Sequence, residues 1–354
     1  MNKHVEWNEL GITFEGLYKN KIGLKKTRMK KLRFLLLPAS IWVCSQEVDT
    51  LKIQELPEEQ LKVQTYTLKD GSVRTYLKPK LLDFVTKLPR NFINTNKDFV
   101  AKDHAYYLGG ALAATLILIP VDQKLTDNSR EIAEKWGMSE DNTYSKVGGV
   151  FKIPKDIGST LYLIGNGSTV VLAGIGFGVY GVIKNDYRAQ ATASGLMESL
   201  ILSGVFTQTI KRVTGRESPF IAEANGNKGG AWNPFPSFSA FGKNTSSYDA
   251  MPSGHLTTFM AGLTVIADNY PDAKWIKPVG YTLAGALCFQ MMQSKVHWAS
   301  DYPLALLMGY FIGKTISRSR FTVSDPHAKQ TRYKLDFLAS RQWEYNMVGV
   351  KVSF

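Results

Sequence analysis

Residues that build disulfides and metal centres are scarce in this chain. Its 354 residues include two cysteines, Cys44 and Cys288, and five histidines. Because Cys44 falls in a predicted export signal, one thiol remains, which excludes a disulfide framework and a cysteine-based metal site. The sequence also has no His-Glu-x-x-His segment and no calcium-loop pattern. We therefore predict no metal ligands and no cofactor.

Basic stripes with interleaved aromatic residues are also lacking, which argues against nucleic-acid binding. The formal net charge is +13, and residues 1–45, with nine Lys or Arg and three Glu, carry +6 of it. The positive charge that remains favours an anionic surface or an anionic substrate.

The N-terminal residues have the pattern of an export signal. A basic segment, Met29–Arg33, precedes a short apolar run, and small side chains follow it before Gln46. We predict a signal peptide at 29–45, preceded by an upstream extension or a mis-called start at 1–28. The alternative is an ordinary core strand or helix. An exported protein of the cell envelope, either periplasmic or membrane-associated, is expected.

Apolar segments of helix length follow a polar arm predicted at residues 46–104. They are separated by Gly, Pro and charged residues, and they show little alternation. The segments are Ala105–Val121, Ile157–Ile183, Ala191–Ile210, His255–Ala267, Val279–Ser294 and Tyr302–Ile316. They predict a mainly α fold, a bundle of about six core helices at residues 105–320.

The apolar segments leave open whether the bundle is soluble or membrane-spanning. A span needs about twenty mostly apolar residues. Ile157–Ile183 is the only segment long enough, and its seven glycines weaken that reading. After residue 320, apolar residues alternate with polar ones, which predicts a short C-terminal β hairpin within residues 321–354, packed on the bundle.

The candidate catalytic residues lie in two short segments. Pro252-Ser253-Gly254-His255 precedes a predicted helix, and His297-Trp298-Ala299-Ser300-Asp301 follows about forty residues later. Two of the five histidines therefore lie in these segments, and a carboxylate follows the second one at four residues' distance.

These segments, with Lys211–Pro219, resemble the type 2 phosphatidic acid phosphatase/haloperoxidase superfamily. That family has Lys-x6-Arg-Pro, then Pro-Ser-Gly-His, then Ser-Arg-x5-His-x3-Asp. Their order, their spacing and the helical segments between them agree over about residues 105–316. The resemblance implies a helical phosphatase of phosphate-bearing small molecules or lipids, with Lys211 in contact with the phosphate.

The chemistry of the residues supports specific roles. A neutral His297 can attack phosphorus through one ring nitrogen, while Asp301 accepts a hydrogen bond from the other and fixes the tautomer. His255 can protonate the leaving oxygen and then activate water. Ser253 and Gly254 begin a helix whose free N–H groups favour an anion. Taken singly, the His297–Asp301 segment would be interpreted as a structural His–Asp pair, and the Pro252–His255 segment as an ordinary capped helix.

Two arginines of the family pattern are missing. Ser218 stands before Pro219, and Gln290-Met291 replaces the Ser-Arg pair. Since guanidinium groups clamp phosphate oxygens well, we expect that Arg216 and Lys295 restore part of the clamp.

The leading hypothesis is a metal-independent phosphatase that hydrolyses a phosphomonoester or lipid phosphate through a phosphohistidine. An isoprenoid diphosphate is a further possible substrate. The alternative is a catalytically weakened relative that binds an anionic lipid or serves an envelope assembly. A vanadate-dependent haloperoxidase ranks lower, because missing arginines weaken oxyanion binding.

Overall fold

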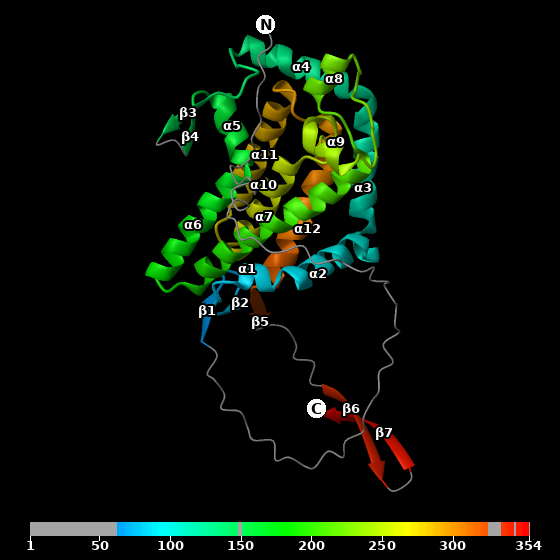
Figure 1. Ribbon diagram of the computed structural model, residues 1–354. Helices are drawn as coiled ribbons and strands as arrows, with labels where there is room; N and C mark the ends of the chain where they lie inside the picture. The colour runs from blue at the N-terminus through cyan, green and yellow to red at the C-terminus, as the bar shows by residue number, and fades with distance from the viewer. Residues whose placement is uncertain (1–61, 148–150, 325–333, 343–344, 354) are drawn as a thin grey trace, which may run out of the picture. The chain divides into compact units, whose positions relative to one another are not determined.

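The computed structural model describes residues 62–147, 151–324, 334–342 and 345–353. Within these ranges the chain is mainly α, as the sequence predicts (Figure 1). The predicted signal peptide and the segment before it lie outside the described residues.

All six apolar segments form helices. They correspond to α3 (Ala105–Leu118), α5 (Ile157–Gly165) with α6 (Gly167–Ile183), α7 (Tyr187–Thr214), α10 (Gly254–Asn269), α11 (Ile276–Gln293) and α12 (Tyr302–Arg318). The prediction of a helical bundle is therefore confirmed. Its apolar centre lies where α7, α10 and α12 pack together, with fully buried Leu196, Val265 and Ile312.

Glycines allow α10 and α12 to approach closely. A Cβ atom on Gly309 would lie 2.5 Å from the carbonyl oxygen of Thr257, and one on Gly313 would lie 2.5 Å from Cβ of Thr264. Any side chain at either position would push the two helices apart. The glycines therefore set the distance between α10 and α12, and with it the spacing of the segments that lead into these helices.

Among the described residues, one helical stretch is long and apolar enough to cross a membrane, and a bent pair of helices passes the same test if it is taken as one span. One runs from Lys102 to Lys135 through α3 and α4 (Asp122–Lys135), and 6% of its most apolar window is buried. The other is the pair α5 and α6, which is bent by 70°. The bend occurs at Asn166, whose side chain accepts a hydrogen bond from the Ser168 amide and begins α6.

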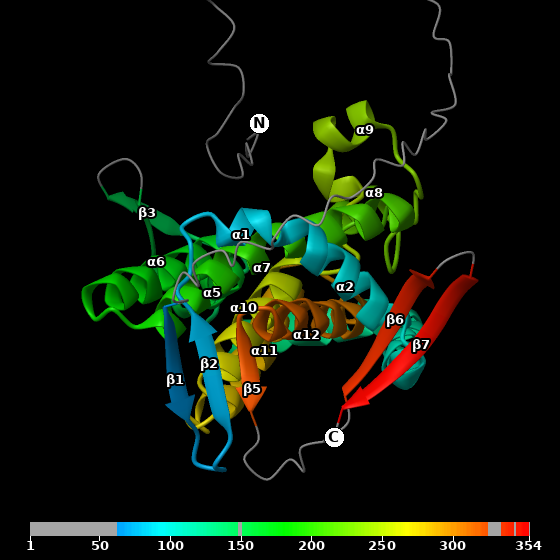
Figure 2. The same cartoon turned by 90° about the horizontal axis from the view of Figure 1, so that it is seen from below.

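A three-stranded antiparallel sheet lies at the C-terminal end of α12. Its order is β1 (Val63–Thr67), β2 (Val73–Leu77) and β5 (Phe321–Ser324), side by side in Figure 2. The sheet therefore joins part of the predicted N-terminal arm to the chain that follows the bundle. The arm also contains α1 (Asp83–Thr86) and α2 (Leu88–Val100).

The predicted C-terminal hairpin is present as β6 (Lys334–Gln342) paired with β7 (Tyr345–Ser353). Its packing on the bundle stays a prediction. A second hairpin, β3 (Tyr144–Val147) with β4 (Phe151–Pro154), was not expected from the sequence. The long connection between α7 and α10 contains two short helices, α8 (Pro219–Asn225) and α9 (Phe238–Lys243).

Candidate functional site

The three motif segments converge, although they are far apart in the sequence. The imidazole rings of His255 and His297 have centroids 5.9 Å apart and lie nearly perpendicular, at 70°. Lys211 adjoins them, because a Cβ atom on Gly254 would lie 3.7 Å from its Nζ. Both imidazoles and the lysine therefore occupy one place in the fold.

The turn after Lys211 depends on glycine. Gly215 ends α7 with a φ of +53°, and its amide donates to the Lys211 carbonyl oxygen at 2.8 Å. A Cβ atom there would lie 1.8 Å from the carbonyl oxygen of Asn233. The left-handed backbone and the close contact both require glycine, so the chain can turn sharply from Lys211 toward Arg216.

The start of α10 links the two histidine segments. Ser253 caps the helix by accepting a hydrogen bond from the Leu256 amide at 3.3 Å, and its own amide donates to the Asp301 carbonyl oxygen at 3.2 Å. The Ser253 hydroxyl also lies 3.6 Å from Sδ of Met291. Its role as a phosphate ligand, and that of Gly254, stays a prediction.

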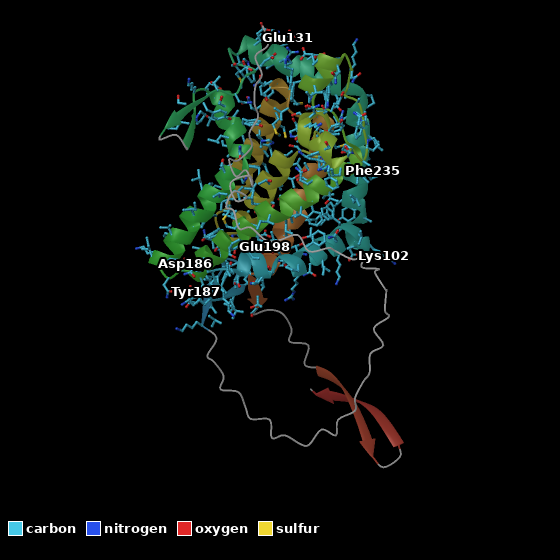
Figure 3. All side chains as sticks on the ribbon, viewed as in Figure 1. Lys102, Glu131, Asp186, Tyr187, Glu198 and Phe235 are labelled. Carbon is cyan, nitrogen blue, oxygen red and sulfur yellow. The ribbon has the colours of Figure 1, made fainter. Side chains whose placement is uncertain are left out.

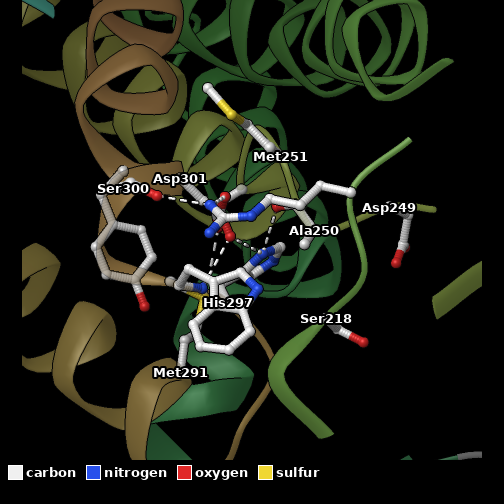
Figure 4. A network of polar contacts seen from close by, with 12 residues as sticks. Ser218, Asp249, Ala250, Met251, Met291, His297, Ser300 and Asp301 are labelled. Carbon is white, nitrogen blue, oxygen red and sulfur yellow. Dashed lines mark hydrogen bonds and ion pairs between the residues drawn. The ribbon is translucent and has the colours of Figure 1, made fainter. Parts of the chain in front are cut away.

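His297 is buried and its tautomer is fixed by the backbone. Nδ1 lies 2.7 Å from the carbonyl oxygen of Ala250, whereas the nearest carboxylate oxygen of Asp301 is 3.6 Å away (Figure 4). Since a carbonyl oxygen can only accept, Nδ1 carries the proton and Nε2 keeps its lone pair. The expected hydrogen bond from His297 to Asp301 is thus replaced by one to Ala250.

Asp301 belongs to a buried network that centres on Arg216. The guanidinium donates to Asp301 at 2.8 Å, to Asp122 at 2.6 Å and to the Ser300 hydroxyl at 2.6 Å. The Ser300 amide and hydroxyl both donate to Asp122, and Asp301 also accepts from the Trp298 amide at 2.8 Å. Arg216, Asp122 and Asp301 are fully buried.

Arg216 and Lys295, the two cations expected to clamp phosphate, each form ion pairs with carboxylates. Two carboxylates hold the Arg216 guanidinium, while the Lys295 ammonium pairs with Glu140 and Glu223, each at 3.0 Å. Both cations are therefore already paired with carboxylates, and their part in a phosphate clamp stays a prediction. Arg216 bonds to the carboxylate of Asp301, which lies 3.6 Å from Nδ1 of His297.

The positions of the missing arginines are occupied by buried side chains. The Ser218 hydroxyl donates to the Ser246 carbonyl oxygen at 2.8 Å, while Gln290 and Met291 are fully buried. These side chains add no positive charge, which leaves Lys211 as the motif cation beside the imidazoles. Its Nζ lies 3.5 Å from Asp249, whose side chain is 22% exposed.

His255 lies in the first turn of α10, and its ring contacts that of Tyr162 with centroids 4.7 Å apart. Part of the residue reaches solvent. Desolvation by the surrounding protein, with smaller contributions from the neighbouring His297 and Lys211, lowers the pKa of His255 to about 3. His255 is therefore neutral at pH 7 unless an anion beside it favours the imidazolium.

Sequence reasoning missed Asp122, Asp249 and the Ala250 carbonyl group. Asp122 begins α4, far from the motifs in sequence, and a backbone carbonyl has no sequence pattern. Asp249 could have been found from the sequence, because it lies three residues before Pro252, where the Pro252–His255 motif begins. Among the described residues, no group of three or more His, Cys, Asp or Glu side chains is arranged to hold a metal ion.

Comparison with protein-family models matches residues 192–325 to the PAP2 superfamily. The matched range contains Lys211, His255, His297 and Asp301, so the resemblance seen in the sequence is confirmed. Searches of curated proteins and of solved structures gave no match. The family match supports a phosphatase-type protein.

Proposed function

We propose that this protein hydrolyses a phosphomonoester, with a lipid phosphate as the preferred substrate, through a phosphohistidine on His297 and without a metal. The observation that carries the proposal is the pair of facing imidazoles, with Nδ1 of His297 bonded to Ala250. This hydrogen bond leaves Nε2 as the nucleophilic nitrogen.

The proposed reaction has two steps. In the first, Nε2 of His297 attacks phosphorus, the bond from phosphorus to the leaving oxygen breaks, and protonated His255 gives that oxygen its proton. In the second, neutral His255 takes a proton from water, which attacks phosphorus and breaks the P–N bond. The negative charge of Asp301 near Nδ1 stabilises the cationic ring in between.

The low pKa of His255 fits this cycle. An anionic ester beside the ring raises the pKa and supports the acid form, and the neutral form returns after the alcohol leaves. Lys211 and the first-turn amides of α10 would face the phosphoryl oxygens. The missing arginines favour the alternative, binding of an anionic lipid without turnover.

An apolar groove supports a lipid substrate. It has a volume of about 490 Å³ and lies between α6, α10 and α11, where its lining includes Phe177, Phe259, Leu263, Ile266 and Leu283. On α10, Phe259 and Leu263 follow His255 at intervals of four residues, so they share its helix face. The groove therefore begins one turn from the imidazole, suitably placed for an acyl or prenyl chain.

The proposal is tested by phosphate release from a long-chain lipid phosphate and from a short soluble monoester. We expect chelator-insensitive turnover that is lost in His297→Ala and in His255→Ala. Leu283→Lys, which places a charge in the groove, should raise KM about tenfold or more for the lipid and leave the short ester unchanged. Thr282→Lys, on the exposed face of α11, is the matched control.

Chelator-sensitive turnover would contradict the proposal. Tight lipid binding by the wild type without any phosphate release would replace it by the binding alternative. The export pattern at 29–45 and the apolar helix Lys102–Lys135 support a place in the cell envelope. This localisation is part of the proposal.

A further inference from the structure

The charges around the two imidazoles do not favour a doubly charged phosphoryl group. Lys211 and Arg216 are the cations, and Asp122, Asp249 and Asp301 are the carboxylates that pair with them. These two cations and three carboxylates together carry one excess negative charge when both imidazoles are neutral. A dianion would enter a site without surplus positive charge, which Coulomb repulsion and desolvation both oppose.

Asp249 is the carboxylate placed to affect the phosphoryl group directly. Asp122 and Asp301 are fully buried and bonded to Arg216, whereas Asp249 is partly exposed and lies 3.5 Å from Nζ of Lys211. It also precedes Ala250, whose carbonyl oxygen accepts the His297 hydrogen bond. Figure 4 shows Asp249, Ala250 and His297 in one close view.

Among the described residues, two cationic side chains adjoin Asp249, and two imidazoles lie next to the site that it flanks. Lys211 on α7 forms the ion pair with Asp249, and Arg216 lies on the segment that forms a β-bridge with it. His297 bonds to Ala250, the residue after Asp249, and His255 on α10 faces His297. The guanidinium of Arg216 is taken by its two buried carboxylates, so Lys211 and the imidazoles decide how Asp249 affects a bound anion.

We propose that Asp249 is a specificity-determining residue that makes this site select a phosphoryl group with a single negative charge. The inference rests on the proposed function and names the charge of its substrate. Because Asp249 offsets part of the positive charge of Lys211, placing a second negative charge on the phosphoryl group costs more than placing the first. Two substrates carry such a group: a monoester protonated below its second pKa of about 6, and a phosphodiester at any ordinary pH.

The same two steps serve both substrates. With a monoester, attack by Nε2 of His297 and proton transfer from His255 release the alcohol, and water then releases inorganic phosphate. With a diester, one P–O bond breaks in the same way, and the phosphoryl group on His297 keeps its second ester. Water then breaks the P–N bond and releases a monoester, so no oxidant, reductant or further reactant is needed.

The test compares 4-nitrophenyl phosphate with methyl 4-nitrophenyl phosphate, using the full chain at about pH 5 and about pH 8, on either side of the phosphate pKa near 6. For the wild type, kcat/KM for the monoester should fall from the lower to the higher pH more steeply than kcat/KM for the diester. In Asp249→Asn at the higher pH, the diester-to-monoester ratio should drop by on the order of tenfold, because a charge at this distance shifts such equilibria by about one unit or more.

Two further variants separate charge from damage to the fold. Asp249→Glu keeps the carboxylate and should keep the wild-type ratio. Asp272→Asn removes a surface carboxylate that accepts from the Lys69 amide and should change nothing. An unchanged ratio in Asp249→Asn, or a wild type that prefers the dianionic monoester, would overturn the inference.

A binding measurement keeps the inference testable if the wild type turns over neither ester, a result that overturns the proposed function. Orthophosphate titrated by calorimetry should bind the wild type more tightly at the lower pH, and Asp249→Asn should lose that preference. Equal affinity at both pH values, or no binding at either, would overturn the inference.

Discussion

Two buried ion-pair networks lie at opposite ends of the bundle, and they differ in what they adjoin. At the α4 end, Arg216 joins Asp122 to Asp301, 3.6 Å from the ring of His297. The other network lies at the end of α12 that leads into β5, where Figure 3 labels Glu198. There Glu198 pairs with Arg320 and accepts a hydrogen bond from Asn91. The length of α12, about 25 Å by helix geometry, separates the two.

The two networks are alike in burial and in chemistry. In each, a buried arginine meets a fully buried carboxylate, and burial, opposed by the arginine and by hydrogen bonds, raises the pKa of Asp122 at one end and of Glu198 at the other. A buried ion pair or a shifted pKa is therefore not a sign of catalysis here. The distinguishing feature of the α4 end is the pair of imidazoles.

The largest expected effect comes from removing either arginine. Arg216→Met and Arg320→Met each leave buried carboxylate charge unpaired, and each should lower the free energy of unfolding by about 3–5 kcal/mol. Thermal or denaturant unfolding measures this loss. Phosphate release per folded molecule should fall about tenfold or more in Arg216→Met alone, because Asp301 is then no longer held beside His297. Equal activity losses in both variants would show that the two ends are not functionally different.

A smaller effect is expected in the pH dependence of stability, which His255 should change at the α4 end of the bundle. Because the pKa of His255 is about 3 in the folded protein and about 6.5 in an unfolded chain, the unfolded state binds more protons between these values. Stability from this group is thus complete above about pH 6.5 and is lost as the pH falls toward 3. The melting temperature of the wild type relative to His255→Asn should therefore fall steadily over that window.

The carboxylates at the two ends should not mimic this dependence. Raised pKa values of Asp122 and Glu198 act in the opposite sense, since their contribution is greatest below an unfolded pKa of about 4 and falls as the pH rises. Both are present in the wild type and in His255→Asn, so they cancel in the difference. A difference that stays constant from about pH 7 to about pH 4 would contradict the lowered pKa of His255.

The two networks also show which parts of the site could be predicted from the sequence. His255 and His297 lie in short motifs whose helices follow from local apolar patterns, and both features could be predicted. The partners of Arg216 could not, because Asp122 is brought to it by tertiary packing from the start of another helix. The exchange of Asp301 for the Ala250 carbonyl as the partner of Nδ1 also depends on backbone placement, which no residue pattern encodes.

Trapping the covalent intermediate tests the central claim most directly. The full chain would be mixed with a monoester labelled on phosphorus, quenched in alkali, where phosphohistidine survives, and mapped by peptide mass spectrometry. The account predicts one phosphoryl group on the peptide that contains His297, and none in His297→Ala. Label on a different residue, or phosphate release by His297→Ala at the wild-type rate, would contradict it.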